Sequence, residues 1–182
     1  MNEQIFTKFP VLKTNRLVLR QLNSNDENGI YNFYSDPVAL KYVPRNLFTE
    51  RIEASDKIKF FDALFDDRKG IWWAISYKEK QDIIGIAGFF EIDKAANKAE
   101  LGYGFLQGNW GKGVGTEIVK TLTDFGFQAI QLHKIYAYIH PDNISSIKVV
   151  EKFGYKREGL FKDHDFAQNK YFDTAVYTKI IS

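Results

Sequence analysis

The chain has 182 residues, a hydrophobic content of 45% and no cysteine. This length and apolar content predict one globular domain spanning residues 1–182. The lack of cysteine excludes disulfides, thiolate metal ligands and a cysteine nucleophile, and no metal site is expected. The net charge of +2 comes from lysines and arginines spread along the chain. They form no basic stripe of the kind that binds nucleic acid.

The N-terminal stretch lacks an apolar core of signal-peptide length, and no run of about 18 apolar residues occurs in the sequence. We therefore expect neither export nor membrane insertion, and a cytoplasmic location.

The first half of the chain predicts a strand, two helices and a meander. Residues 16–22 alternate as in a strand. Helix-capping side chains at residues 23–26 precede a helix that Asp36-Pro37 ends. A second helix is expected over residues 49–65, with Glu50 and Glu53 near its positive end, and residues 41–45 are predicted to be a loop. Strands are expected at residues 72–77, 83–90 and 99–106, and their short polar turns favour an antiparallel meander.

The second half predicts a helix, a strand, a short helix and two strands. Apolar residues recur at helical spacing from Val114 to Ala129, and residues 134–139 form the next strand. The short helix follows Pro141-Asp-Asn143 and ends at Gly154, before strands at residues 155–160 and 171–179. The expected fold class is therefore α/β (mixed α+β), one mixed sheet with helices packed on it.

The segment Asn109-Trp-Gly-Lys-Gly-Val-Gly-Thr-Glu117 places three glycines at every second position between a strand and a helix. Small residues there let backbone N–H groups converge, and the helix N-terminus adds roughly half a positive charge, so the segment can bind an anion. Its spacing is neither the dinucleotide fingerprint nor a Walker loop. A tight turn whose glycines only relieve crowding is the alternative.

Two motifs together resemble the GNAT superfamily of acetyl-CoA-dependent N-acetyltransferases, from about residue 16 to the C-terminus. Trp110-Gly-Lys-Gly-Val-Gly115 resembles the family's Q/R-x-x-G-x-G/A loop, which wraps the coenzyme A pyrophosphate. Asn143-Ile-Ser-Ser146, followed by Gly154-Tyr155, resembles its N-x-x-A/S motif. The resemblance implies the GNAT fold, a mostly antiparallel mixed sheet of about seven strands flanked by about four helices.

Within the superfamily, the chain is similar to the ribosomal-protein N-acetyltransferases of the RimJ and RimL type. This similarity rests on Thr14-Asn-Arg-Leu-Val-Leu-Arg20, Ala99-Glu-Leu-Gly-Tyr103, the glycine loop and Arg157-Glu-Gly-Leu160 with Asp173. It implies acetyl transfer from acetyl-CoA to a primary amine, with a peptide N-terminal α-amine as the expected acceptor. Small amines (aminoglycoside, polyamine or amino acid) and a non-catalytic acyl-CoA-binding module are the alternatives. Dimers are common in this branch, so a homodimer is an alternative to a monomer.

The resemblance also implies which residues contact the coenzyme. A backbone N–H of the segment 105–107 would face the thioester carbonyl. The expected coenzyme contacts are Phe105, Leu106, Gln107, Trp110, Gly111, Lys112, Gly113, Val114, Gly115, Thr116, Asn143 and Ser146. Trp110 stands where many members have Gln or Arg. Val150 stands where others carry a tyrosine that protonates the departing thiolate, so that role would fall to another residue or to water.

Three residues are candidates for proton transfer. Ser146 is the candidate donor to sulfur, and its alternative role is a helix N-terminal serine that shares capping with Ser145. Glu100 is the candidate base, because strand alternation places it on one face with two glycines, which often mark close approach of a ligand. Asp165 is a second acidic candidate from the resemblance. A solvated surface carboxylate is the alternative for both acids. His140 and His164 are further candidates, and Tyr42 is expected in the wall of the acceptor pocket.

The strength of the base depends on the acceptor. An α-amine has a pKa of about 8 and a lysine about 10.4, so neutralising the amine at pH 7 costs roughly 1 kcal/mol for the first and 4 to 5 kcal/mol for the second. Without a strong base, a peptide N-terminus is therefore the easier acceptor.

Overall fold

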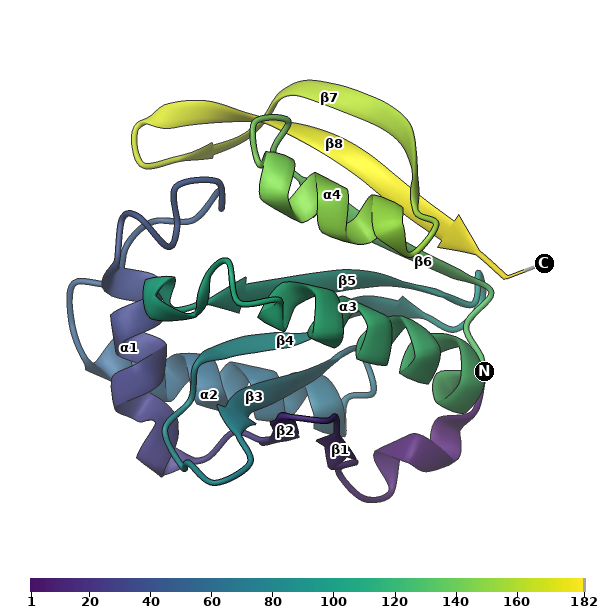
Figure 1. Cartoon of the computed structure of the whole chain (residues 1–182), viewed down its shortest axis with the longest axis horizontal. Coiled ribbons are helices and arrows are strands. Elements are labelled where there is room, and N and C mark those ends of the chain that lie inside the picture. Colours follow the sequence, from purple (N-terminus) through teal and green to yellow (C-terminus); the bar gives the residue numbers. More distant parts are fainter. Residues whose placement is uncertain (182) are drawn as a thin grey trace.

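Eight strands form one mixed sheet in the order β1-β2-β3-β4-β5-β6-β8-β7 in the computed structural model, which describes residues 1–181 (Figure 1). The strands are β1 Leu12–Lys13, β2 Leu17–Gln21, β3 Ile71–Tyr77, β4 Gly85–Asp93, β5 Lys98–Phe105, β6 Lys134–Ile139, β7 Lys156–Ala167 and β8 Lys170–Ile180. The helices are α1 Glu27–Ser35, α2 Ile52–Asp66, α3 Val114–Phe125 and α4 Ile144–Lys152, with short turns at η1 Glu3–Phe6, η2 Ser24–Asp26, η3 Gln107–Asn109 and the π-helical η4 Gly126–Ile130.

The two faces of the sheet are buried under different helices. Trp72 and Ala74 of β3 pack with α1 and α2, whereas Trp73 and Ile75, which alternate with them, pack with α3. Because successive strand side chains point to opposite faces, one strand contributes to both cores. Each helix keeps its buried residues on one side, as helical spacing predicts.

Within residues 1–181, the sheet opens between β5 and β6, which are its one pair of parallel neighbours. Their pairing covers Lys98↔Lys134, Ala99↔Ile135 and Glu100↔Tyr136 and then stops. From Leu101 to Phe105, β5 remains paired with β4 alone. A strand edge with free backbone groups is thereby left inside the molecule, where a ligand can enter the sheet.

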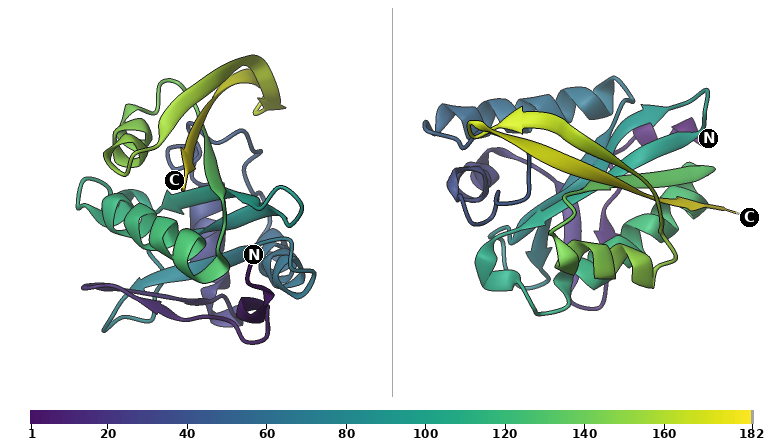
Figure 2. Two further views of the ribbon diagram at one scale, coloured as in Figure 1. Left: turned by 90° about the vertical axis from the view of Figure 1, so that its right-hand side faces the viewer. Right: turned by 90° about the horizontal axis from the view of Figure 1, so that it is seen from above.

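The hairpin of β7 and β8 extends over the segment that joins α1 to α2 (Figure 2). In the hairpin turn, Gln168 donates through its backbone N–H to Asn46 Oδ1 at 2.8 Å and through Nε2 to the Arg45 carbonyl at 3.0 Å. These bonds tie the hairpin tip to the α1–α2 segment across the sheet.

The predicted fold class and element order are confirmed, and the strand count is one higher than expected. The additional strand, β1, has two residues and pairs with β2, which is too short for an alternation signal. β7 continues to Ala167 instead of ending at residue 160; most of its side chains are exposed, so its sequence lacks the apolar alternation of a half-buried strand. The helix expected from Val114 to Ala129 ends at Phe125 and continues as the π turn η4.

Over residues 1–181, none of the helices has both the length and the apolar character that crossing a membrane would require. Within the same residues, no group of three or more His, Cys, Asp or Glu side chains is arranged to hold a metal ion.

Candidate active site

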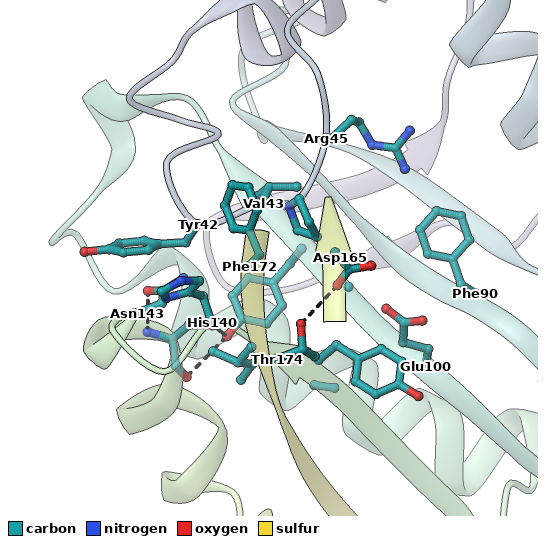
Figure 3. A pocket seen from close by; sticks show the side chains of 18 of the residues that line it. Tyr42, Val43, Arg45, Phe90, Glu100, His140, Asn143, Asp165, Phe172 and Thr174 are labelled. Atoms are coloured by element: carbon teal, nitrogen blue, oxygen red, sulfur yellow. Dashed lines mark hydrogen bonds between the residues drawn. The ribbon is translucent and has the colours of Figure 1, made fainter. Parts of the chain in front are cut away.

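Two cavities meet at the opening between β5 and β6. One, of about 500 Å³, is lined by the glycine loop and the start of α3. The other, of about 460 Å³, is lined by acidic and aromatic side chains from β4, β5, β7 and β8 and from the α1–α2 segment (Figure 3). Both are lined by Tyr103, Asn143 and Ser146, so these residues mark the junction. We name them the glycine-loop cavity and the acidic cavity.

The glycine loop has the backbone conformation that an anion site requires. Gly111 and Gly113 have φ angles of +71° and +74°, which L side chains rarely adopt. Gly113 is the N-cap of α3, and no side chain caps the first-turn N–H groups there. Free N–H groups and the positive end of the helix dipole fit a pyrophosphate. Gly115 does not have a positive φ. Its Cβ position lies 3.5 Å from the Phe105 ring, so a glycine here leaves room beside that ring.

Two side chains hold this loop in place. The Trp110 indole donates from Nε1 to the Phe105 carbonyl at 2.9 Å, which ties the loop to the end of β5. Arg16 pairs through Nε with Glu117 of α3 at 2.8 Å and donates from Nη2 to the Lys112 carbonyl at 3.0 Å. Thr14 bonds the same Glu117 carboxylate. The Thr14-Asn-Arg16 motif, which directly precedes β2, thus holds the glycine loop and α3 in place.

The structure reduces the number of backbone N–H groups in residues 105–107 that are free to face the thioester carbonyl. The N–H of Leu106 already donates to the Ile84 carbonyl at 2.9 Å. Ladder groups alternate in direction, so the N–H of Phe105 faces away from β4, toward the opening. Phe105 lines the glycine-loop cavity, whereas Leu106, Gln107 and Lys112 are not among its lining residues.

Ser146 lies at the junction and is bonded to a tyrosine that sequence reasoning missed. Its Oγ lies 2.6 Å from the hydroxyl of Tyr103. Asn143 caps α4 by accepting from the Ser146 N–H at 3.2 Å, so the serine hydroxyl is not needed as the cap. Burial raises the pKa of Tyr103 to about 12, which keeps its hydroxyl protonated. Val150 is fully buried in the core and offers no proton.

Glu100 lies in the acidic cavity, which three more carboxylates, Glu91, Asp165 and Asp173, also line. Burial, together with the charges of Glu91 and Asp165, raises the pKa of Glu100 to about 7. Glu91 accepts from Tyr136 Oη at 2.8 Å. Asp165 accepts from Thr174 Oγ1 at 3.1 Å, and Figure 3 shows Glu100 and Asp165 pointing into this cavity. A carboxylate with this pKa exchanges protons readily near neutral pH.

Gly102 and Gly104, which share a strand face with Glu100, were expected to allow the close approach of a ligand. The structure gives another reason for glycine at these positions. A Cβ at Gly102 would meet the Trp72 ring at 2.9 Å, and one at Gly104 would meet the Phe33 ring at 2.3 Å. The close approach is therefore that of two aromatic side chains of the protein, both of which line the acidic cavity.

The remaining sequence candidates also converge on these cavities. Tyr42 lines both of them, and His140 and His164 line the acidic one. Trp110, Gly111, Gly113, Val114, Gly115, Thr116 and Asn143 line the glycine-loop cavity. Sequence reasoning missed Tyr103, Glu91 and Arg45. Alternation assigns Tyr103 to the face opposite Glu100, and Glu91 is turned by a positive φ of 48° at the irregularity in β4, for which the sequence has no marker.

The fold is that of GNAT acetyltransferases. The family model described as Acetyltransferase (GNAT) domain matches residues 16–156, and the chain belongs to this family. It is thus an acetyl-CoA-dependent enzyme, in agreement with the resemblance in its motifs.

Three proteins illustrate the similarity of this chain to other acetyltransferases. The chain is 33% identical to an uncharacterized N-acetyltransferase, p20, of Bacillus licheniformis, over 92% of this chain and 94% of the relative. It shares its fold with spermidine N-acetyltransferase of Vibrio cholerae, solved with CoA and spermine (TM-score 0.81, 21% identity, 92% and 96% of the two chains). It also shares it with the Salmonella typhimurium acetyl transferase that modifies the N-terminal serine of ribosomal protein L7/L12 (TM-score 0.83, 16% identity, 95% and 100%).

Proposed function

We propose that this N-acetyltransferase acetylates the α-amine of a peptide N-terminus, which occupies the acidic cavity with Glu100 as general base. The observation that carries the proposal is the position of Glu100 in a cavity that opens onto the glycine-loop cavity, with a pKa of about 7.

The strength of this base suits an α-amine. The pKa of an α-amine, about 8, exceeds that of Glu100 by about one unit, whereas the pKa of a lysine, about 10.4, exceeds it by more than three. Proton transfer to Glu100 is therefore uphill by roughly 1 kcal/mol from the α-amine and 4 to 5 kcal/mol from lysine. Asp165 and Glu91 serve this role indirectly, since their charges help to raise the pKa of Glu100.

The coenzyme's side of the reaction falls to residues at the junction. Acetyl-CoA supplies the activated acetyl thioester. We assign the Phe105 N–H to the thioester carbonyl oxygen, where a backbone donor stabilises developing negative charge. Ser146 donates its hydroxyl proton to the departing sulfur, and Tyr103, 2.6 Å away, returns a proton to Ser146. Tyr103 then regains its proton from solvent, and Glu100 releases to solvent the proton that it took from the amine. The loop from Trp110 to Thr116 and the N-terminus of α3 hold the pyrophosphate.

A small cationic amine is the second candidate acceptor. The charges of Glu91 and Asp165 disfavour ionisation of Glu100 in the acidic cavity, so a ligand with more than one ammonium group would relieve this repulsion. The structural likeness to a spermidine acetyltransferase fits this candidate.

The acceptor panel that tests the proposal measures thiol release from acetyl-CoA. Peptides with a free N-terminus, the same peptides blocked at the N-terminus but carrying lysine, spermidine, an aminoglycoside and free amino acids would be compared by kcat/KM. We expect the free α-amine peptides to exceed the blocked lysine peptides by at least about 100-fold, from the difference in amine pKa. Higher kcat/KM for spermidine than for every peptide would replace the proposal with the second candidate. Tight CoA binding without turnover of any amine would indicate a non-catalytic module.

A further inference from the structure

Because the acceptor is proposed to occupy the acidic cavity, the remaining charges of that cavity bear on which acceptor fits. Besides its carboxylates, the cavity is lined by Arg45, from the α1–α2 segment, and by Trp72 of β3. Figure 3 shows the Arg45 side chain extending into the space between Phe90 and Asp165.

Arg45 has no partner of opposite charge. Within residues 1–181 its guanidinium forms no ion pair and donates no hydrogen bond, and it lies over the Tyr34 ring at 5.9 Å. Two hydrogen bonds from Gln168 hold this part of the segment. The Arg45 carbonyl accepts from Gln168 Nε2 at 3.0 Å, and Asn46 Oδ1 accepts from the Gln168 backbone N–H at 2.8 Å. The backbone at Arg45 is therefore anchored, and its exposed guanidinium is left available to a ligand.

Trp72 contributes a buried donor without an acceptor. Its side chain is 5% exposed, and its Nε1–H has no hydrogen-bond partner within residues 1–181. The ring packs on Phe61 and Phe90, with centroids 4.9 and 4.4 Å away. A buried N–H without a partner is costly, and such donors in native proteins commonly bind a ligand or water.

The surroundings of Arg45 show that its positive charge is not neutralised. Lys57 of α2 is 8% exposed and lies against the rings of Phe60 and Phe61 at 4.3 and 4.6 Å. Burial, with the charge of Arg45 as the second cause, lowers the pKa of Lys57 to about 7. Arg45 is not among the influences on the pKa of Glu100, which are burial, Glu91 and Asp165. The acidic cavity thus carries charges of both signs, the Arg45 guanidinium and its carboxylates.

We propose that Arg45, together with the indole N–H of Trp72, binds a carboxylate of the acceptor, close to the amine that Glu100 deprotonates. A bipolar cavity matches a ligand that carries both charges. Arginine binds carboxylates through two parallel N–H groups, and Trp72 supplies a third donor. This inference rests on the proposed function and names its substrate class: peptides with aspartate or glutamate beside the N-terminal residue.

The test compares two peptides that differ in one charge, Ser-Glu-Ala-Ala-amide and Ser-Gln-Ala-Ala-amide. Initial rates give KM, and calorimetry on the CoA-bound enzyme gives Kd without requiring turnover. We expect both constants to be roughly 10- to 100-fold lower for the glutamate peptide, as for a hydrogen bond between charged groups. Arg45→Gln should abolish this preference, and Arg45→Lys should restore part of it.

Two further variants separate the subsite from other effects. Trp72→Phe replaces the indole with a smaller aromatic ring and removes the donor, so it should reduce the preference about fivefold. Arg51→Gln removes one positive charge from an exposed arginine that bonds Asn28 and lines neither cavity, so it should preserve the preference.

Equal constants for the two peptides, or a preference that survives Arg45→Gln, would overturn the subsite. If both peptides are acetylated with equal KM, the proposed function stands and this inference fails. If the enzyme binds the glutamate peptide selectively but acetylates no peptide α-amine, the carboxylate subsite stands and the proposed function fails.

Discussion

Tyr103 and Glu100 lie three residues apart in β5 and serve opposite sides of the proposed reaction. Glu100 shares its strand face with two glycines and points into the acidic cavity. Tyr103 points to the other face, and it reaches Ser146 of α4 because β6 has separated from β5 at this point. Each group has a raised pKa caused mainly by burial. Glu100 is therefore a base that titrates near neutrality, and Tyr103 is a phenol that stays protonated.

At this scale, the hydroxyls of Ser146 and Tyr103 are expected to act as one unit. Ser146→Ala and Tyr103→Phe should each lower kcat roughly 10- to 100-fold, with Kd for CoA changed less than about threefold, because each removes a proton donor and leaves the loop intact. The double variant should be no slower than the slower single variant. Steady-state kinetics and calorimetry with CoA supply the measurements.

A buried tyrosine outside the cavities provides the control. Tyr155 is bonded to Thr123 at 2.9 Å, and Tyr155→Phe should reduce stability without the loss in kcat. Losses that multiply in the double variant, or a fall in CoA affinity equal to the fall in kcat, would argue against the proton pathway.

At the scale of elements, the glycine loop and α3 form one coenzyme-binding unit that other strands stabilise. Trp110 attaches the loop to β5, and Arg16 attaches it to the segment before β2 while pairing with Glu117 of α3. The left-handed conformations of Gly111 and Gly113 allow the chain to enter the helix with its N–H groups exposed. The sequence motif therefore describes a backbone shape, and its side-chain anchors lie elsewhere in the chain.

Replacing Gly113 tests whether this shape binds the pyrophosphate. Gly113→Glu should raise Kd for CoA by at least about 100-fold, because it strains a φ of +74° and brings a negative charge to the anion site. The melting temperature should fall by only a few degrees. Gly108→Glu adds the same charge five residues earlier, where a Cβ meets nothing within 4 Å, and should change Kd less than about threefold. Equal Kd values in the two variants would contradict the phosphate assignment.

At the scale of the whole molecule, the burial of Glu100 suits its proposed role as a base but lowers the stability of the fold. The fold holds four carboxylates, Glu91, Glu100, Asp165 and Asp173, around one cavity and partly buries Glu100, which disfavours its ionised form. In the unfolded chain Glu100 has an ordinary pKa near 4.5. The destabilisation is therefore absent below that pH, grows as the pH rises, and is complete above about pH 7.

Glu100→Gln is accordingly expected to stabilise the fold while lowering activity. Its melting temperature should exceed that of the wild type by roughly 2–6 °C at pH 8 and by much less at pH 5. The wild-type kcat/KM should rise with pH through about 7, and the variant should lose this limb and most of its activity. Calorimetric unfolding and pH–rate profiles provide the two measurements.

Glu158→Gln is the matched control for stability. The Glu158 carboxylate pairs with Lys134 at 2.7 Å, and this bond lowers its pKa. Removing it should leave the melting temperature at pH 8 unchanged or slightly lower. An increase equal to that of Glu100→Gln would mean that charge removal in general, rather than the burial of Glu100, stabilises the protein.

The sequence by itself determined the order of the elements, the glycine loop and the short helix that follows Asn143. These depend on neighbouring residues, whose spacing and backbone preferences are written locally, as in Asp36-Pro37 or Gly113. It also placed Glu100 on the correct face of its strand. It predicted seven strands, because the two residues of β1 carry no periodicity.

Only the tertiary structure decided which distant groups meet. The separation of β5 from β6 depends on the register of the whole sheet, and it brings Tyr103 to Ser146, 43 positions along the chain. The same packing brings Arg45, Trp72 and the carboxylates together around the acidic cavity. Local patterns fix the elements because backbone energetics are short-ranged. The proposed site depends on burial and on charges from separate elements, which exist only once the chain has folded.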